Sequence, residues 1–137
     1  MFFKKDKINE KDSELIKVGA LLIHAAKIDE DYSQKEAEII KQALLKINSD
    51  IKDINQIIKK AEEIEKNSNQ ILDFTREIKN MSEQDKIKII KTLWKIIFSN
   101  KEADIYETNL MRRLGGLLYI DKKIMADIKD KIKKEYL

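Results

Sequence analysis

Apolar residues recur every three or four positions along most of this chain, with polar residues between them. The spacing is clearest between residues 87 and 98, where Ile90, Leu93, Trp94 and Ile97 fall on one face of a helix. No stretch shows a convincing strand pattern, so we predict an all-α fold, a compact bundle of seven helices. The predicted helices begin near Ser13, Ser33, Asp50, Ile71, Ser82, Asp104 and Asp121.

Two polar elbows between helices are alike and indicate an internal repeat. Their key positions recur at an offset of 71 residues, pairing Asp29 with Asn100, Ser33 with Asp104, and Glu36 with Glu107. Ser33 and Glu36 have the spacing of a capping box, in which each side chain bonds the backbone amide of the other residue. Asp104 and Glu107 repeat that spacing. We therefore predict two related helix–elbow–helix halves.

Small residues within two predicted helices indicate close packing. Gly19 and Ala20 predict that another helix approaches the first one closely. Gly115 and Gly116 lie inside the sixth helix, where two glycines cost roughly 1–2 kcal/mol relative to alanine. They indicate either a close helix crossing or a bend.

Length and composition predict one domain. We expect residues 1–11 to form a flexible arm and residues 12–137 a single helical domain. Without a membrane-spanning stretch or a signal peptide, the chain is predicted to be cytoplasmic. Phe2 and Phe3 beside two lysines allow peripheral membrane contact, although folding back onto the body is the favoured alternative. The net charge of +3 disfavours a nucleic-acid interface.

The residue types argue against an enzyme. The chain has no cysteine, one histidine and no glycine-rich phosphate loop. His24 is interpreted as an ordinary helix residue, and Trp94 as part of the core. Arg76, Arg112 and Arg113 are the only arginines among 28 basic residues. They indicate either structural ion pairs, which we favour, or contact with an anionic partner.

Four motifs in order resemble the tellurite-resistance TerB-like family of bacterial helical domains. They are Leu22 to Asp29 before the first elbow, Asp73-Phe74-Thr75-Arg76, Met81-Ser82-Glu83 through Leu93-Trp94, and Tyr106-Glu107 through Arg112-Arg113-Leu114. The resemblance covers roughly residues 12 to 130. It implies an all-α domain with two related halves that serves in stress-related and membrane-linked assemblies. Protein partners, as yet unidentified, are therefore expected.

The resemblance also implies that acidic residues at the elbows bind a divalent metal. We expect weak binding of Ca²⁺ or Mg²⁺, because an amide and a lysine, Lys101, stand in the second elbow and reduce its negative charge. The alternative, favoured by the spacing, is that the elbow residues only cap helices. The candidate ligands are Asp29, Asp31, Glu36, Asn100, Asp104 and Glu107.

The sequence thus favours a non-enzymatic binding or scaffold domain linked to tellurite resistance or stress response. One alternative is a metal-assisted hydrolase that uses paired carboxylates. Another is a lysine-rich module that binds acidic membrane surfaces or nucleic acid, supported only by the basic ends of the chain. Near-neutral net charge argues against that module.

Overall fold

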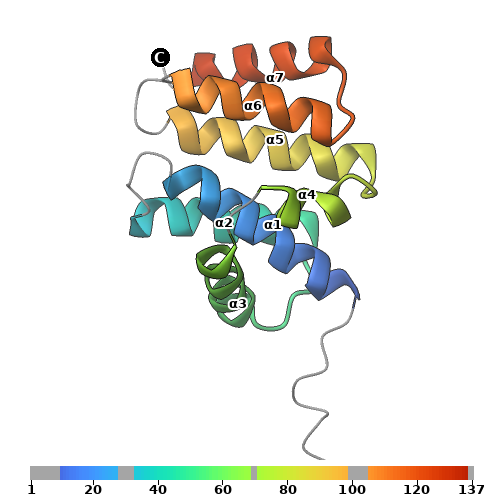
Figure 1. Cartoon of the computed structure of the whole chain (residues 1–137). Helices are drawn as coiled ribbons and strands as arrows, with labels where there is room; N and C mark the ends of the chain where they lie inside the picture. The colour runs from blue at the N-terminus through green and yellow to red at the C-terminus, as the bar shows by residue number, and fades with distance from the viewer. Residues whose placement is uncertain (1–9, 28–32, 69–70, 99–104, 136–137) are drawn as a thin grey trace, which may run out of the picture.

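The computed structural model describes residues 10–27, 33–68, 71–98 and 105–135, which form seven α-helices (Figure 1). These ranges contain no strand, and the predicted all-α fold is confirmed. None of the helices within them is long and apolar enough to cross a membrane. The helices are α1 (Glu10–Lys27), α2 (Gln34–Ile47), α3 (Ile54–Asn67), α4 (Leu72–Ile78), α5 (Glu83–Phe98), α6 (Ile105–Leu117) and α7 (Lys122–Glu135).

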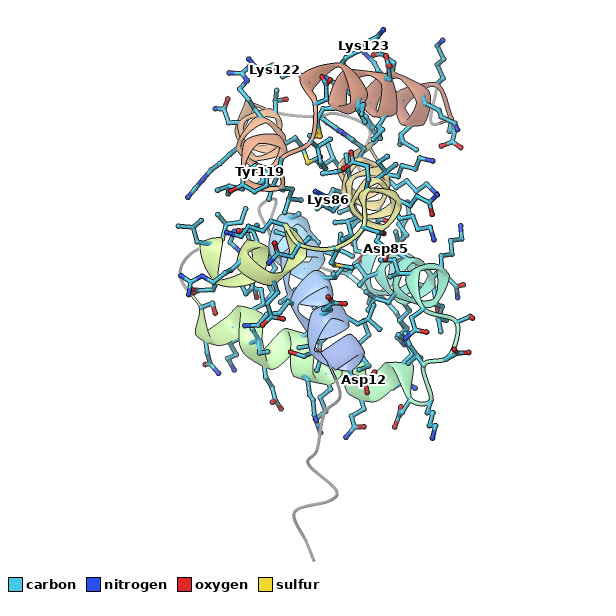
Figure 2. All side chains as sticks on the ribbon, turned by 90° about the vertical axis from the view of Figure 1, so that its right-hand side faces the viewer. Asp12, Asp85, Lys86, Tyr119, Lys122 and Lys123 are labelled. Carbon is cyan, nitrogen blue, oxygen red and sulfur yellow. The ribbon has the colours of Figure 1, made fainter. Side chains whose placement is uncertain are left out.

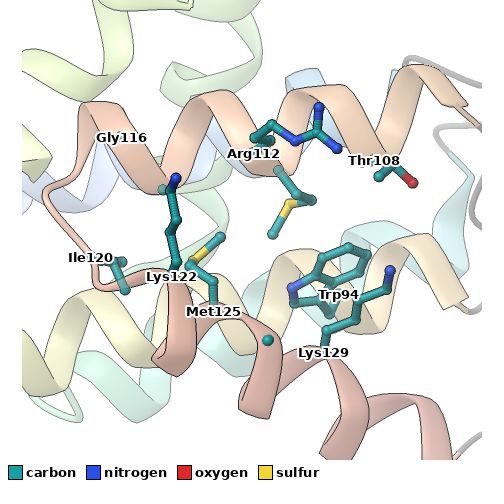
Figure 3. Close-up of a pocket in the computed structure, with 11 residues that line it drawn as sticks. Trp94, Thr108, Arg112, Gly116, Ile120, Lys122, Met125 and Lys129 are labelled. Carbon is teal, nitrogen blue, oxygen red and sulfur yellow. The ribbon is translucent and has the colours of Figure 1, made fainter.

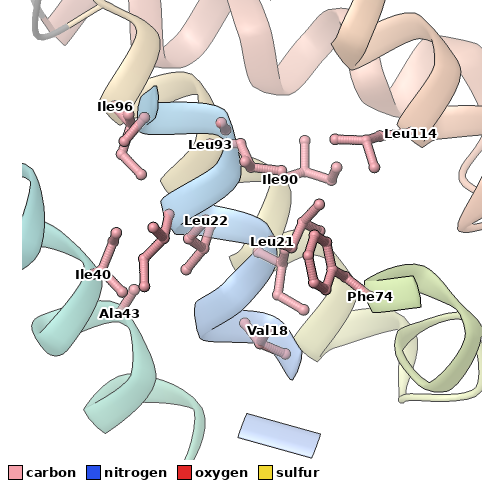
Figure 4. Packing of buried hydrophobic residues seen from close by; sticks show 14 of the residues in the cluster. Val18, Leu21, Leu22, Ile40, Ala43, Phe74, Ile90, Leu93, Ile96 and Leu114 are labelled. Carbon is pink, nitrogen blue, oxygen red and sulfur yellow. The ribbon is translucent and has the colours of Figure 1, made fainter. Parts of the chain in front are cut away.

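Helix α1 is the centre of the N-terminal part of the bundle. It packs against α2, α3, α4 and α5, and its apolar residues are buried around most of its circumference. Figure 4 shows Leu21 and Leu22 of α1 among Ile40, Phe74 and Leu93 from three other helices. Helix α5 continues this core, because it packs against α1, α2 and α7.

The predicted close approach at Gly19 is confirmed. A Cβ atom placed on Gly19 would lie 3.0 Å from the Cβ of Ala61 on α3, closer than side-chain carbons normally come. Ala61 is fully buried. The pair therefore sets how closely α1 and α3 can cross.

The order of the helices agrees with the predicted repeat. In the described residues α1 runs to Lys27 and α5 to Phe98, and α2 follows from Gln34 and α6 from Ile105, on the far side of each elbow. Helix α1 packs against α3 as α5 packs against α7. Helix α4 stands between the two halves in the chain. The layout of the halves is thus α1-α2-α3 and α5-α6-α7.

Two predicted helix starts carry the expected caps. The Ser82 hydroxyl oxygen accepts a hydrogen bond of 3.1 Å from the amide of Asp85. The Asp121 carboxylate accepts one of 2.8 Å from the amide of Lys123. Both caps satisfy amides that have no partner within the helix.

Two other predicted starts differ from the structure. Helix α1 begins at Glu10, three residues before Ser13. The prediction that the third helix begins near Asp50 is wrong, because α3 begins at Ile54 and Asp53 accepts the amide of Gln56 at 3.2 Å. The Asp50 amide instead donates to the Asn48 side chain at 3.0 Å, in a local turn that delays the helix.

Helix α6 ends in a Schellman motif, which shapes the turn into α7. The amides of Ile120 and Tyr119 donate to the carbonyls of Gly115 and Gly116 at 2.9 and 3.3 Å. Tyr119 has a φ of 57°, in the left-handed region that usually favours glycine. Its ring is exposed, so the backbone turn and not side-chain packing determines this position.

Candidate functional site

Most of the predicted metal ligands lie outside the described residues. Asp29, Asp31, Asn100 and Asp104 belong to the undescribed elbows, and Glu107 lies on α6 without a described side chain. Helices α1 and α5 end, and α2 and α6 begin, on the same side of the molecule in Figure 1. Convergence of the elbow carboxylates stays a prediction.

Glu36, the one candidate ligand whose side chain is described, serves as a helix cap. Its carboxylate accepts a hydrogen bond of 2.9 Å from the Ser33 amide, and the Ser33 hydroxyl donates to the same oxygen. The predicted capping box is therefore present. Burial acts to raise the pKa of Glu36, but the hydrogen bonds from Ser33 outweigh it and lower the pKa below 4.5. The carboxylate stays ionised and engaged at the start of α2.

The structure contains a cleft between α5, α6 and α7 that the sequence did not predict. The cleft has a volume of about 430 Å³. Figure 3 shows its lining side chains between α6 and α7. Its lining residues are Trp94 from α5; Thr108, Met111, Arg112, Gly115 and Gly116 from α6; Ile120 from the turn; and Lys122, Met125, Ala126 and Lys129 from α7.

The interior of the cleft is apolar. Trp94, Met111 and Ile120 are buried, and Met125 is half-buried. The indole of Trp94 stacks on the ring of Phe98, with 5.4 Å between centroids and 18° between planes. Two thioethers beside an indole form a surface that adapts to apolar groups of different shape.

Gly115 allows α7 to come close to α6 at this cleft. A Cβ atom on Gly115 would lie 3.3 Å from the Cγ and Cε atoms of Met125. A Cβ on Gly116 would meet nothing within 4 Å. Of the two predicted alternatives, the close crossing therefore applies to Gly115.

Three cationic side chains surround the apolar interior. Arg112 and Lys122 are exposed, and Lys129 is half-buried. The ammonium group of Lys129 lies 5.3 Å from the centroid of the Trp94 ring, in a cation–π contact. None of the lining residues is acidic. Among the described lining residues, the cleft therefore presents three positive charges and no negative one over an apolar interior.

The indole N–H of Trp94 has no acceptor among the described residues. Its Nε1 atom is buried and makes no hydrogen bond there, although Trp94 is only 3% exposed. Figure 3 shows Nε1 on the side of the ring that faces Met125. A buried donor without a partner is rare and energetically unfavourable in folded proteins.

A second polar cluster joins α1 to α3. The Glu65 carboxylate accepts a hydrogen bond of 2.7 Å from Lys27, and its other oxygen lies 3.3 Å from Nδ1 of His24. Glu65 is buried at the end of α3. The contacts hold the two helices together, in agreement with the interpretation of His24 as an ordinary helix residue. Within the described part of the chain, no three His, Asp or Glu side chains converge as metal ligands.

The amino-acid sequence indicates part of the cleft. Trp94 was predicted in the core and is buried, but it also forms a wall of the cleft. Arg112 was considered for an anionic partner or an ion pair, and it has no ion pair with a described carboxylate. Lys122, Met125 and Lys129 were missed, because no local pattern indicates which face of α7 turns toward Trp94.

The comparisons with known proteins returned one match. A family model described as tellurite resistance protein TerB matches residues 15–130, most of the chain and all of the cleft. The searches of curated proteins and of solved structures found no match.

Proposed function

Because the chain belongs to the TerB family, we propose that it is a non-catalytic binding domain that recognises its ligand in the cleft between α5, α6 and α7. The family description, tellurite resistance protein TerB, supports a role linked to tellurite resistance, and a role in stress response is part of the proposal. Cytoplasmic localisation and association with protein partners are parts of the same proposal.

The observation that carries this proposal is the chemistry of the cleft lining. Arg112, Lys122 and Lys129 are side chains that hold a full positive charge and recognise anionic groups. Trp94 and Met125 provide apolar contact beside them. A concave, mainly apolar site with a few polar groups that fix orientation is the usual form of a ligand-binding site.

The residue types of the cleft lining favour binding over acid–base catalysis, because none of the lining residues is a histidine, an aspartate or a glutamate. A general base works best when its pKa lies near the working pH. Glu36, the candidate ligand with a described side chain, has a pKa below its ordinary value, away from neutrality. This carboxylate also lies at the start of α2, outside the cleft lining.

A fragment screen by two-dimensional NMR tests the cleft as the binding site. Trp94 is the single tryptophan, so its indole N–H gives one resonance that reports on the cleft directly. Binding fragments should perturb this resonance and the amides of α6 and α7. Ala126→Phe, from an exposed lining position, should block these shifts without lowering the melting temperature. Perturbations confined to α2 and α3 would contradict the proposal.

We also infer weak binding of Ca²⁺ or Mg²⁺ at the elbows, independently of the cleft. Support comes from the carboxylates of Asp29 and Asp104 and from the helix ends on one side of the molecule. Oxygen ligands of this kind suit both cations. Calorimetric titration with each cation should give saturable heat that disappears in Asp29→Asn. No heat and no NMR shift at millimolar cation would contradict this inference.

A further inference from the structure

We propose that the ligand of the cleft is a small amphipathic anion, a carboxylate or phosphate group attached to an apolar chain or ring. This inference rests on the proposed function, because it takes the cleft between α5, α6 and α7 as the binding site. It adds the chemical class of the ligand, which follows from the charge, the shape and one buried donor of the cleft.

The charge of the cleft selects an anionic group. Arg112 and Lys122 are exposed at its edge, and neither forms an ion pair with a described carboxylate. Arg112 supplies a planar guanidinium that can hold two oxygens of a carboxylate or phosphate at once. A cationic ligand would meet three like charges and no acidic side chain among the lining residues.

The interior of the cleft selects an apolar body. Trp94, Met111 and Ile120 are buried, so an inorganic anion pushed among them would lose its hydration without gaining enough partners. An anion with an apolar tail avoids this problem, because the head stays at Arg112 and Lys122 while the tail enters. The cleft favours such amphiphiles over inorganic phosphate.

The size of the cleft selects a small molecule. A volume of about 430 Å³ falls within the range of roughly 300–1,000 Å³ in which pockets enclose most of a small ligand. A stable protein interface instead buries about 800 Å² on each partner. The limited volume between α6 and α7 therefore favours a free small molecule over a protein surface.

The indole N–H of Trp94 offers a specific contact. Lys129 lies over the face of the ring, so its ammonium does not occupy the edge that carries Nε1. Because Nε1 is buried, a ligand reaches it only when a lining side chain turns aside. Met125 is half-buried, unbranched and on the side that Nε1 faces, so it is the side chain best suited to move. An oxygen carried on the apolar body of the ligand could then accept the unpaired hydrogen, while the anionic head stays at Arg112 and Lys122.

Three amphiphiles of equal chain length test the ligand class. Decanoate, decanol and decylamine are titrated below their micelle concentrations, with the emission of Trp94 and its indole N–H resonance as readouts. Decanoate should bind in the cleft and shift the indole resonance. Decanol and decylamine should bind about tenfold more weakly or worse, the difference expected from one charge-assisted contact.

Variants of the charged edge give a matched comparison. Arg112→Gln with Lys122→Gln should weaken decanoate binding by about tenfold at an unchanged melting temperature, since both side chains are exposed. Lys123→Gln, at an exposed position of α7 outside the cleft lining, should bind as the wild type does (Figure 2). Trp94→Phe keeps an apolar wall without the N–H and should weaken binding of 10-hydroxydecanoate, which carries a second oxygen on its chain, more than binding of decanoate, as followed by backbone NMR.

The outcomes separate this inference from the proposed function. Equal binding of all three amphiphiles would overturn charge selection while leaving the cleft as a binding site. Binding of phosphatidylglycerol vesicles without binding of decanoate would assign the anion to a membrane and overturn a free ligand. If neither amphiphiles nor NMR fragments perturb Trp94, both proposals fail.

Discussion

The ammonium group of Lys86 lies 2.9 Å from the carbonyl oxygen of Leu118 and so joins α5 to the end of α6 (Figure 2). The same group lies 3.4 Å from the carbonyl of Lys79 at the end of α4. Carbonyls at helix ends lack partners within the helix and carry partial negative charge. One lysine, only 6% exposed, therefore neutralises the ends of two helices.

Replacing Lys86 should destabilise the fold. Lys86→Met keeps the apolar stem but leaves the carbonyls of Leu118 and Lys79 without this donor, so we expect a loss of about 2 kcal/mol. Urea denaturation gives the free energy of unfolding. Lys88→Met is the control, since the ammonium of that lysine on the same helix meets Asp85 and the Lys46 carbonyl at an exposed position and should contribute under about 0.5 kcal/mol. Equal losses of unfolding free energy in both variants would show that the contacts of Lys86 with the helix ends do not stabilise the fold.

The contact between Gly19 and Ala61 predicts a steric penalty. Gly19→Ala should destabilise the protein by about 1–3 kcal/mol, because the two Cβ atoms would lie 3.0 Å apart and push α1 from α3. Thermal denaturation of the single variant measures this change. An alanine there normally favours a helix, so an increase in the melting temperature would show that the crossing is not tight.

The two glycines of α6 should respond differently to alanine. Gly116→Ala adds a methyl group in open space and should stabilise the protein by roughly 0.5–1 kcal/mol, because alanine restricts the unfolded chain. Gly115→Ala should gain less, because Met125 must move from a Cβ only 3.3 Å away. Parallel urea titrations compare the two. A larger gain for Gly115→Ala would contradict the predicted order.

The capping carboxylate of Glu36 predicts a pH dependence. The pKa of Glu36 is lower in the folded protein than the ordinary 4.5. The ionised carboxylate therefore contributes fully to folding stability above pH 4.5, and this contribution is lost as the pH falls through the lowered pKa. Glu36→Gln should therefore lose less stability than the wild type between about pH 5 and pH 2. Denaturation at several pH values measures both profiles.

Glu63→Gln provides the control for this profile. Glu63 is exposed on α3, and its variant should follow the wild-type profile. A Glu36→Gln profile parallel to that of the wild type would show that the cap does not depend on ionisation.

The sequence predicted the fold better than the cleft for a physical reason. Helical spacing and caps such as Ser33 and Ser82 depend on residues three or four positions apart, and these predictions were confirmed. The start of α3 was missed because the Asn48 side chain competes for a backbone amide. The cleft depends on Trp94 and Lys129, which meet only when α5 and α7 pack together.

The candidate metal site at the elbows stays a prediction from the sequence. Its prediction relies on a repeated elbow and on the resemblance to a family, and its carboxylates lie mostly outside the described residues. Glu36 illustrates the ambiguity of such a motif, because the same spacing serves a helix cap. Periodicity alone cannot distinguish a capping glutamate from a metal ligand.

The position of α5 means that the two halves are similar in layout yet do not form autonomous units. Helix α5 belongs to the second half, but it packs against α1 and α2 of the first as well as against α7. Leu93, on this shared helix, is fully buried. A chimaera that exchanges one half with a relative would therefore need a matching α5 surface, so mutations on the two sides of this boundary must coevolve.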